Sequence, residues 1–344
     1  MLSERDGHRL DASQVGSALA DLDEQRIAVW LGTVGDVPAA STAMYLRSLR
    51  HPDEDEPLPI GYWAHLFVLP EHRKLMLYPQ LVFTMRRAMG ELGIEAILTA
   101  MRRPNVTEGH LKLGFKVVCA WSVLIKPLKP FALLAKHKGL PVLAALAPVG
   151  DGLWRAGQSL RSGRPEGSLR VQRTPASNVR DDPKLLDSLA ELMYRGSQDR
   201  IATRWTSELL RSRLGGGVDG KPYSVVLVHD EAALVGFAIC RLAVRGNGIQ
   251  TGVILDMVAH DEDERVLRAL AQACEAQVRS EGAEGVLWLD GAGEVTSRVL
   301  QRRGFRVATS ETYRLIAFTG EEATPLMTED PAAWRFTFLD HDAF

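Results

Sequence analysis

The chain has 344 residues, 46% hydrophobic and 24% charged, with a formal net charge of −2. The length suits two domains of ordinary size, and the charge excludes a global basic field, so we expect no nucleic-acid partner. Cys119, Cys240 and Cys274 lie far apart with no C-x-x-C pair, which excludes a disulfide framework and a zinc site. The start lacks a signal-peptide core and no run approaches about 20 apolar residues, which predicts a cytoplasmic protein.

The first part of the chain is predicted to contain a strand-rich start and one main helix. Its early elements are expected to be a helix at 11–22 and strands at 26–34, 39–49 and about 61–69. The main helix is predicted to begin near Pro79, because proline suits the first helical position, and to end at Gly93, which tolerates left-handed backbone angles. Its apolar residues recur at helical spacing, at Val82, Met85, Met89 and Leu92.

The second part repeats this order with more elements. The predicted strands are 171–174, 223–228, 233–243, 250–258 and 313–318, and the predicted early helices are 183–195 and 206–214. Asp261 with Glu264 three residues later resembles a capping box and predicts the start of the main helix.

One block of the sequence occurs twice, about 190 positions apart. Val68 to Gly114 and Val258 to Gly304 span the same 46 positions, and both run strand, helix, strand, helix. This predicts a duplicated α/β (α+β) unit. The expected domains are 1–128, shortened at its start, and 169–319, with a connector at 129–168 and a tail at 320–344.

The connecting region is basic and amphipathic. Between positions 126 and 167 it has seven Lys or Arg residues against Asp151 and Glu166, interleaved with apolar clusters. A helical connector packed between domains is one interpretation. The other is peripheral membrane contact through residues 129–164, since a basic amphipathic segment can lie on an anionic membrane surface.

The repeat resembles the GNAT superfamily of acyl-CoA-dependent N-acyltransferases. The resemblance rests on a strand, a Pro-x-x-Arg turn, a helix, a strand and a helix ending in Gly-Phe, seen at 68–73 and 110–115 and again at 233–241, 254–256 and 302–305. The doubling looks like tandem members such as mycothiol synthase and the Fem-type aminoacyl transferases. It implies two GNAT-like domains, each with a mixed, mostly antiparallel sheet flanked by helices.

A narrower likeness is to uncharacterised bacterial tandem-GNAT proteins associated with exopolysaccharide or cell-surface glycan synthesis. Residues 205–213 resemble their Leu-x-Trp-Arg helix, although Ser212 stands where they have tryptophan. The ending Trp334–Asp342 resembles their Trp-x-x-Thr-x-x-Asp-x-Asp tail. These aromatic residues could also simply anchor the tail to the core.

The resemblance places acetyl-CoA or another acyl-CoA in the first copy. Such enzymes hold a pyrophosphate at a helix N-terminus, after a basic residue and two glycines. Arg73 and Lys74 supply the charge and Val68 the strand edge, but Met76 and Tyr78 stand in the glycine positions. In the second copy Asp263 and Glu264 replace the basic pair; this predicts a solvated helix cap there that repels a pyrophosphate.

Four further residues are candidates for the chemistry. His110 replaces the tyrosine that the family often has four residues before the glycine, so it is the expected acid, and His65 is the expected base. Asp256 on an apolar strand, with Arg241, is a candidate substrate group. Locally bonded histidines and a structural Asp256–Arg241 pair are the alternatives.

The predicted function is acyl transfer from acyl-CoA to a small amine, a hydroxyl or a glycan precursor. A tandem-GNAT binding or scaffold protein without catalysis is the alternative favoured by the missing glycines and the acidic second turn. Fem-type transfer from a charged tRNA is a third possibility, which would require a basic groove. No metal ligand set is recognised.

Overall fold

The structure of the chain is a computed structural model. It describes residues 27–139, 141–161, 169–215, 222–245, 248–320 and 328–341. The helix predicted at 11–22 lies outside the described residues. The chain divides into two compact units, each made of several stretches, and each is described here by itself. Unit 1 comprises 1–121, 199–204 and 312–335, and unit 2 comprises 122–198, 205–311 and 336–344.

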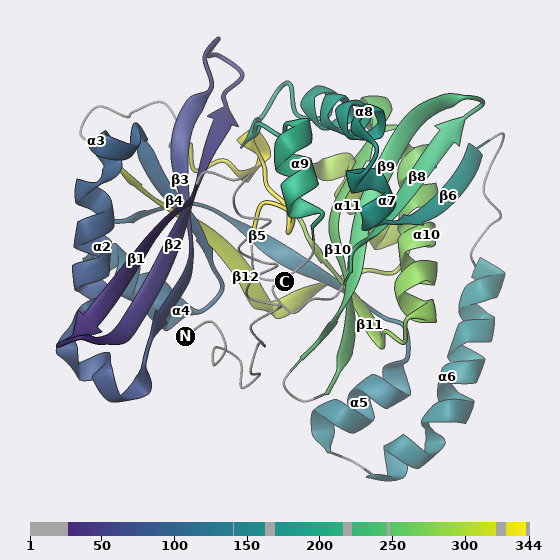
Figure 1. Ribbon diagram of the computed structural model, residues 1–344. Helices are drawn as coiled ribbons and strands as arrows, with labels where there is room; N and C mark the ends of the chain where they lie inside the picture. Colours follow the sequence, from purple (N-terminus) through teal and green to yellow (C-terminus); the bar gives the residue numbers. More distant parts are fainter. Residues whose placement is uncertain are drawn as a thin grey trace. The chain divides into compact units, whose positions relative to one another are not determined.

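Unit 1 is built on a sheet with helices on it (Figure 1). The strand order is β13-β7-β2-β3-β4-β12, and β1 pairs with β2. All of these pairs are antiparallel except β3 with β4 and β13 with β7. The strands are β1 (Ile27–Val34), β2 (Val37–Arg50), β3 (Leu58–Val68), β4 (Ala96–Met101), β7 (Ile201–Thr203), β13 (Trp334–Arg335) and the end of β12 (Arg306–Thr319). The helices are η2 (Pro70–Leu75), α2 (Leu77–Arg87), α3 (Met89–Leu92) and α4 (Pro104–Lys112).

The core of unit 1 forms where α2 lays its apolar face on the sheet. Val82, Met85 and Met89 are buried against Trp63 and Ile97. Gly93 ends α3 with φ of 63°, as its residue type predicts. Helix α2 begins at Leu77 rather than at Pro79, so the proline occupies the third helical position, where its missing N–H is still one of the groups without an intrahelical acceptor.

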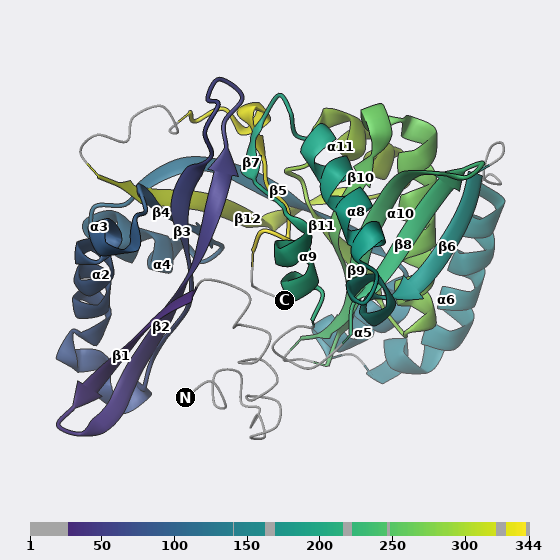
Figure 2. The same ribbon diagram turned by 45° about the horizontal axis from the view of Figure 1, so that its top comes forward.

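Unit 2 repeats this plan with a fuller set of helices (Figure 2). Its strand order is β5-β11-β10-β9-β8-β6, and only β10 and β11 are parallel. The strands are the end of β5 (Lys116–Pro127), β6 (Leu169–Pro175), β8 (Ser224–Asp230), β9 (Ala233–Val244), β10 (Gln250–Ala259) and β11 (Gly285–Leu289). The helices are α5 (Pro130–Lys138), α6 (Pro141–Arg161), α7 (Ala176–Arg180), α8 (Pro183–Arg195), α9 (Ser207–Arg213), η3 (His260–Glu262), α10 (Glu264–Ser280) and α11 (Glu294–Arg302). The remaining short helix, η4 (Pro331–Ala333), belongs to unit 1.

The core of unit 2 lies between α10 and its sheet. The residues Leu267, Leu270, Cys274 and Val278 recur at helical spacing and are all buried there. Cys119, Cys240 and Cys274 are free and buried. The mixed sheets flanked by helices confirm the predicted fold class.

The two units exchange their final strands. In each copy the last helix, α4 or α11, leads into the last strand, β5 or β12. The end of β5 pairs with β11 in unit 2, from Val123 opposite Leu289 to Pro127 opposite Gly285. The end of β12 pairs with β4 in unit 1, from Arg314 opposite Met101 to Thr319 opposite Ala96. The units therefore interleave in sequence, in place of the contiguous domains expected at 1–128 and 169–319.

The basic connector forms two helices within unit 2. Lys129 donates to the Gly282 carbonyl, and Lys136 bridges Glu284 at 2.7 Å. Helices α5 and α6 pack on each other, and a Cβ at Gly150 would lie 2.6 Å from the Phe131 ring. No described helix is long and apolar enough to span a bilayer.

Candidate acyl-donor site

Each unit contains a bulged strand at the same position of the repeat. In unit 1, two residues of β3, His65 and Leu66, lie opposite the single residue Thr42 of β2. In unit 2, Leu255 is the extra residue of β10 against β9. His65 has φ of 56°, in the left-handed region, which a non-glycine residue seldom adopts. Bulges bend a strand and often occur beside active sites, so this point of the repeat is a candidate site in both units.

The bulged strand leaves its parallel neighbour soon after the two begin to pair. Strand β3 pairs with β4 only from Ile60 to Tyr62, and β10 pairs with β11 only from Thr251 to Ile254. Past those points the edge that faces the parallel neighbour has no strand partner among the described residues. Backbone N–H and C=O groups on such an edge can bond to an extended ligand.

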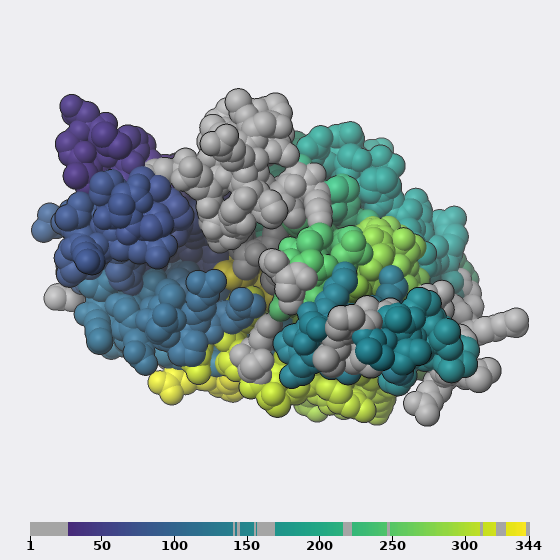
Figure 3. Space-filling model, turned by 90° about the horizontal axis from the view of Figure 1, so that it is seen from below, coloured from purple at the N-terminus to yellow at the C-terminus, as the bar shows by residue number. Residues whose placement is uncertain are grey.

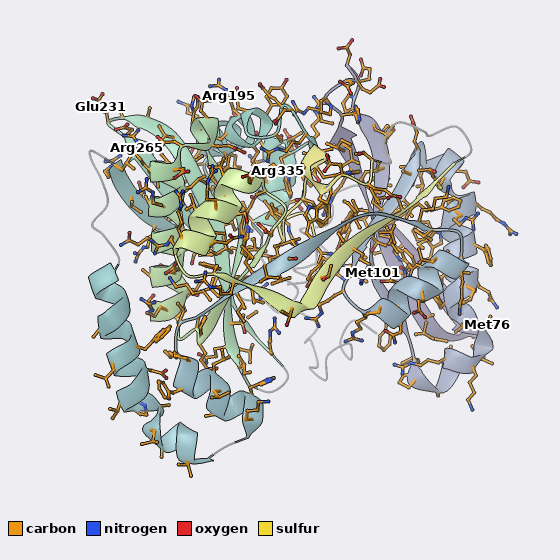
Figure 4. All side chains as sticks on the ribbon, turned by 180° about the vertical axis from the view of Figure 1, so that it is seen from behind. Met76, Met101, Arg195, Glu231, Arg265 and Arg335 are labelled. Atoms are coloured by element: carbon orange, nitrogen blue, oxygen red, sulfur yellow. The ribbon has the colours of Figure 1, made fainter. Side chains whose placement is uncertain are left out.

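The turn after β3 ends in a helix start that has no side-chain cap. The 3-10 helix η2 leads to Met76, whose φ is 56°, and α2 follows without any side chain accepting from its first N–H groups. Met76 adopts the left-handed conformation that a glycine adopts easily, so the loss of glycine has not abolished the turn. Met76 is 63% exposed and lies at the edge of unit 1 (Figure 4).

Two cations border this helix start. Arg73 and Lys74 are exposed in the last turn of η2, and neither η2's last turn nor α2's first turn contains a carboxylate. An uncapped helix N-terminus with neighbouring cations favours an anion, since the free N–H groups and the dipole add to the side-chain charge. Pro79 removes one N–H donor, which leaves those of Leu77 and Tyr78.

The equivalent turn in unit 2 supplies the side chain that caps its own helix. The Asp263 carboxylate caps α10 by accepting from the Arg265 N–H at 2.7 Å, and it also pairs with the Arg265 guanidinium at 2.8 Å. The hydrogen bond from Arg265 lowers the pKa of Asp263, which keeps the cap charged. Glu264 is paired with Arg298 and Arg302. An anion would meet carboxylates here, as the sequence predicted.

The capping box predicted for this helix is wrong in detail. Asp263, not Asp261, is the N-cap, because Asp261 turns into the left-handed region at φ of 51° inside η3. Its carboxylate pairs with His260 at 3.0 Å instead. Figure 4 labels Arg265, the residue that the cap holds.

The carboxyl-terminal segment bonds across the end of the parallel pair in unit 2. The Phe336 N–H donates to the Gly291 carbonyl, just after β11, and the Leu339 N–H donates to the carbonyl of the bulged Leu255 in β10. Arg213 of α9 fastens the segment by donating to the carbonyls of Leu339 and His341. Phe338 is 1% exposed. The predicted anchoring of the tail aromatics is therefore confirmed, and Asp342 lies outside the described residues.

This contact is a difference between unit 2 and unit 1. Residues 255–258, from the bulge of β10 onward, are all buried. The corresponding residues of β3, 65–68, are all half-exposed, including Val68. The strand edge that a ligand would need is therefore covered by the protein's own chain in unit 2 and is more open in unit 1.

His110 lies in an aromatic cluster at the inner side of the unit 1 turn. Its ring is fully buried, 4.6 Å from Trp63 and 5.6 Å from Phe115 between ring centroids. Its Nδ1 lies 2.7 Å from the Val106 carbonyl and 3.0 Å from the Tyr78 hydroxyl. Because a carbonyl only accepts, Nδ1 carries the proton, and Nε2, which has no hydrogen-bond partner, is the bare nitrogen.

The protonation of this pair follows from burial. Desolvation lowers the pKa of His110, against the bond to Val106 that raises it, so the imidazole is neutral at neutral pH. Burial raises the pKa of Tyr78, so its hydroxyl keeps its proton. The role of His110 as acid stays a prediction. Tyr78 is the hydroxyl that sequence reasoning missed: it stands in a glycine position of the turn pattern, so only the fold reveals its contact with His110.

His65 is bonded within the sheet. Its Nε2 lies 2.6 Å from the Tyr45 hydroxyl, and the two rings meet edge to face. The side chain is half-exposed and arises from the bulge itself. It is therefore well placed beside the open strand edge, and its role as base stays a prediction.

Asp256 and Arg241 occupy the corresponding region of unit 2. Both are buried, Asp256 on β10 and Arg241 on β9. An oxygen of Asp256 accepts from the Met257 N–H at 2.7 Å, and the Arg241 guanidinium lies 5.4 Å from the Tyr223 ring centroid. Their role toward a substrate stays a prediction. No group of residues suited to a metal ion occurs in the described part of the chain.

Comparison with solved structures identifies the fold. A tandem GNAT protein from the clavulanic acid biosynthesis pathway matches with a TM-score of 0.57 and 12% identity, covering 88% of this chain and 87% of that one. A GCN5-related N-acetyltransferase from Anabaena variabilis matches at 0.56 and 12%, covering 87% of this chain and 64% of that one. Saccharomyces cerevisiae N-myristoyltransferase with bound myristoyl-CoA matches at 0.55 and 14%, covering 82% and 67%. A scan against known protein families and a search of curated proteins find no match. The fold is that of the tandem GNAT proteins.

Proposed function

We propose that this protein is an acyl-CoA-dependent N- or O-acyltransferase and that unit 1 holds the acyl donor. One observation carries the proposal: the turn after the bulged strand favours a bound anion in unit 1, whereas the equivalent turn in unit 2 is occupied by carboxylates. Unit 1 offers an uncapped helix start beside Arg73 and Lys74, while unit 2 caps its helix with Asp263. The tail that covers Leu255 in unit 2 has no counterpart, among the described residues, at the half-exposed strand end of unit 1.

The residues of unit 1 divide the binding between them. The N–H groups of Leu77 and Tyr78, with the two cations, would hold the diphosphate of CoA. The edge of β3 between Tyr62 and Val68, which has no strand partner among the described residues, would bond to the amides of the pantetheine arm. Bound acyl-CoA supplies a thioester that an amine or hydroxyl can attack.

The chemistry requires a proton to be taken from the acceptor and one to reach the leaving thiolate. His65 is the half-exposed base candidate at the bulge. The protonated Tyr78 hydroxyl, positioned by His110 at 3.0 Å, is the donor candidate. The acceptor is proposed as a small amine, a hydroxyl compound or a glycan precursor on the strength of the sequence resemblance alone.

Ligand-induced stabilisation tests the proposal. Acetyl-CoA and a longer acyl-CoA should raise the melting temperature of the full chain, because a ligand at about 100 times its Kd stabilises the native state by about 2.7 kcal/mol. Arg73→Ala/Lys74→Ala should weaken binding about tenfold and reduce its salt dependence, since exposed charges on a diphosphate contribute about 0.5–1 kcal/mol each.

The matched control is Arg170→Ala/Lys184→Ala, which removes two exposed cations of unit 2. It should bind acyl-CoA like the wild type. No stabilisation by either acyl-CoA, or equal loss in both double variants, would refute the assignment of the donor to unit 1.

A catalytically inactive binding protein is the second candidate. The observation that favours it is the enclosure of His110, whose neutral imidazole has its Nδ1 proton engaged and is 0% exposed. Release of free CoA thiol, measured with a thiol reagent over a panel of amines, separates the two functions. Acyl-CoA binding without thiol release by any acceptor would favour the binding protein. Nothing among the described residues favours transfer from tRNA.

A further inference from the structure

Helix α6 of unit 2 presents an apolar stripe to solvent. Val142, Leu146, Val149 and Leu153 recur at spacings of four, three and four, which places them on one side of an α-helix. They are 71%, 55%, 68% and 71% exposed, in the order of the chain. Single exposed aliphatic residues are ordinary on a protein surface, but four in one row call for a partner.

The opposite side of α6 is already used. Ala147 and Asp151 are buried, and Gly150 lies against the Phe131 ring. Both oxygens of Asp151 cap the start of α5, accepting from the Phe131 N–H at 2.9 Å and from the Ala132 N–H at 3.2 Å. The α5–α6 hairpin is therefore held together by its polar and small residues, and its apolar stripe is left outside. Figure 3, which looks at the protein from below, shows this part of the chain at the surface.

The charged residues of the hairpin are mostly cationic. Residues 129–161 contain five cationic side chains and one carboxylate: Lys129, Lys136, Lys138, Arg155, Arg161 and Asp151. Because Asp151 is buried and engaged as a cap, the hairpin turns no carboxylate to solvent. The hairpin therefore has a net positive charge in a chain whose overall net charge is −2.

We propose that the α5–α6 hairpin docks on an anionic lipid surface. Helix α6 would lie in the interface with its stripe toward the acyl chains, and the exposed Lys138 would meet the lipid phosphates. A second copy of the chain fits less well, because pairing the stripes would bring two hairpins of like charge together. The exposed aromatic residue Trp154, 41% exposed and next to the stripe, suits the same boundary.

Vesicle sedimentation of the full chain tests the proposal. The wild type should bind vesicles of phosphatidylcholine with phosphatidylglycerol and bind phosphatidylcholine alone far less. Leu146→Glu/Leu153→Glu should weaken binding by about tenfold or more, since it places carboxylates in the stripe facing the lipid. Both positions are over half exposed, so circular dichroism should show an unchanged fold.

The matched control is Val29→Glu/Leu31→Glu, which changes two exposed aliphatic residues of β1, 59% and 63% exposed, and should bind as the wild type does. Lys138→Glu should weaken binding to anionic vesicles alone. Absent binding to anionic vesicles, equal binding to neutral ones, or wild-type binding by the stripe variant would each overturn the proposal. So would light scattering showing a wild-type dimer that the stripe variant converts to a monomer.

Discussion

The exchanged strand β5 is fixed in unit 2 by a buried ionic cluster, and Glu275→Gln should destabilise that unit strongly. Glu275 of α10 lies 2.7 Å from the Lys126 ammonium of β5 and 3.0 Å from the Arg303 guanidinium after α11. The side chains of Lys126 and Glu275 are each 5% exposed. Burial lowers the pKa of Lys126, more than the attraction of Glu275 raises it.

The magnitude follows from what the substitution leaves behind. The amide keeps the shape of Glu275 but removes its negative charge, so two cations face each other without compensation. Removing one partner of a buried ion pair costs about 3–5 kcal/mol. Lys126→Met/Glu275→Gln should regain much of this loss, because methionine removes the buried ammonium while Arg303, 14% exposed, can still reach water.

Urea denaturation monitored by tryptophan fluorescence measures the effect. Glu281→Gln, an exposed change at the C-terminal end of the same helix, is the matched control and should stay within about 0.5 kcal/mol of the wild type. A loss below about 1 kcal/mol in Glu275→Gln, or a double variant less stable than the single one, would show that the cluster does not hold β5 in place.

Two further predictions concern the aromatic cluster and the tail. The pKa of His110 in the folded protein lies below its ordinary value of 6.5, so the unfolded chain binds the additional proton and stability falls as the pH drops below 6.5. In thermal melts, His110→Phe should therefore lose less stability than the wild type between pH 7 and pH 5. Equal losses of stability in the two proteins would contradict the buried neutral imidazole. Phe338→Ala should lower the stability of unit 2 by about 3–5 kcal/mol, because the ring is 1% exposed. Denaturant midpoints should show that loss, with Phe83→Ala, an exposed phenylalanine of α2, nearly unchanged; similar losses in both would refute a packed tail.

Local sequence signals predicted most of the elements, because they depend on nearby residues. Helix α8 covers 183–195, the residues expected from apolar spacing, and the repeat of strand, helix and strand recurs in both units. The cation pair Arg73 and Lys74 and the capping carboxylates of unit 2 also lie where the repeat alignment places them.

What the sequence could not reveal depends on contacts between distant residues. The Tyr78 hydroxyl meets His110 across 32 positions, and the Leu339 N–H reaches Leu255 from the far end of the chain. Met76 stands where the family pattern has a glycine, but a methionine can enter the left-handed region at a cost of about 1–2 kcal/mol when the surroundings impose it. Strand exchange leaves no local pattern, since a strand has the same composition whichever sheet receives it.

The reciprocal strand exchange also determines when β4 can complete its pairing during translation. Met101 must wait for its partner Arg314, which the ribosome adds 213 residues later (314 − 101). At about 5–20 residues per second, this interval lasts about 10–40 s. Throughout it, one edge of β4 lacks its final neighbour and can recruit a foreign strand. The nascent chain should therefore depend on chaperones until translation is almost finished, and a gene cut between the copies would yield two fragments that fold only together.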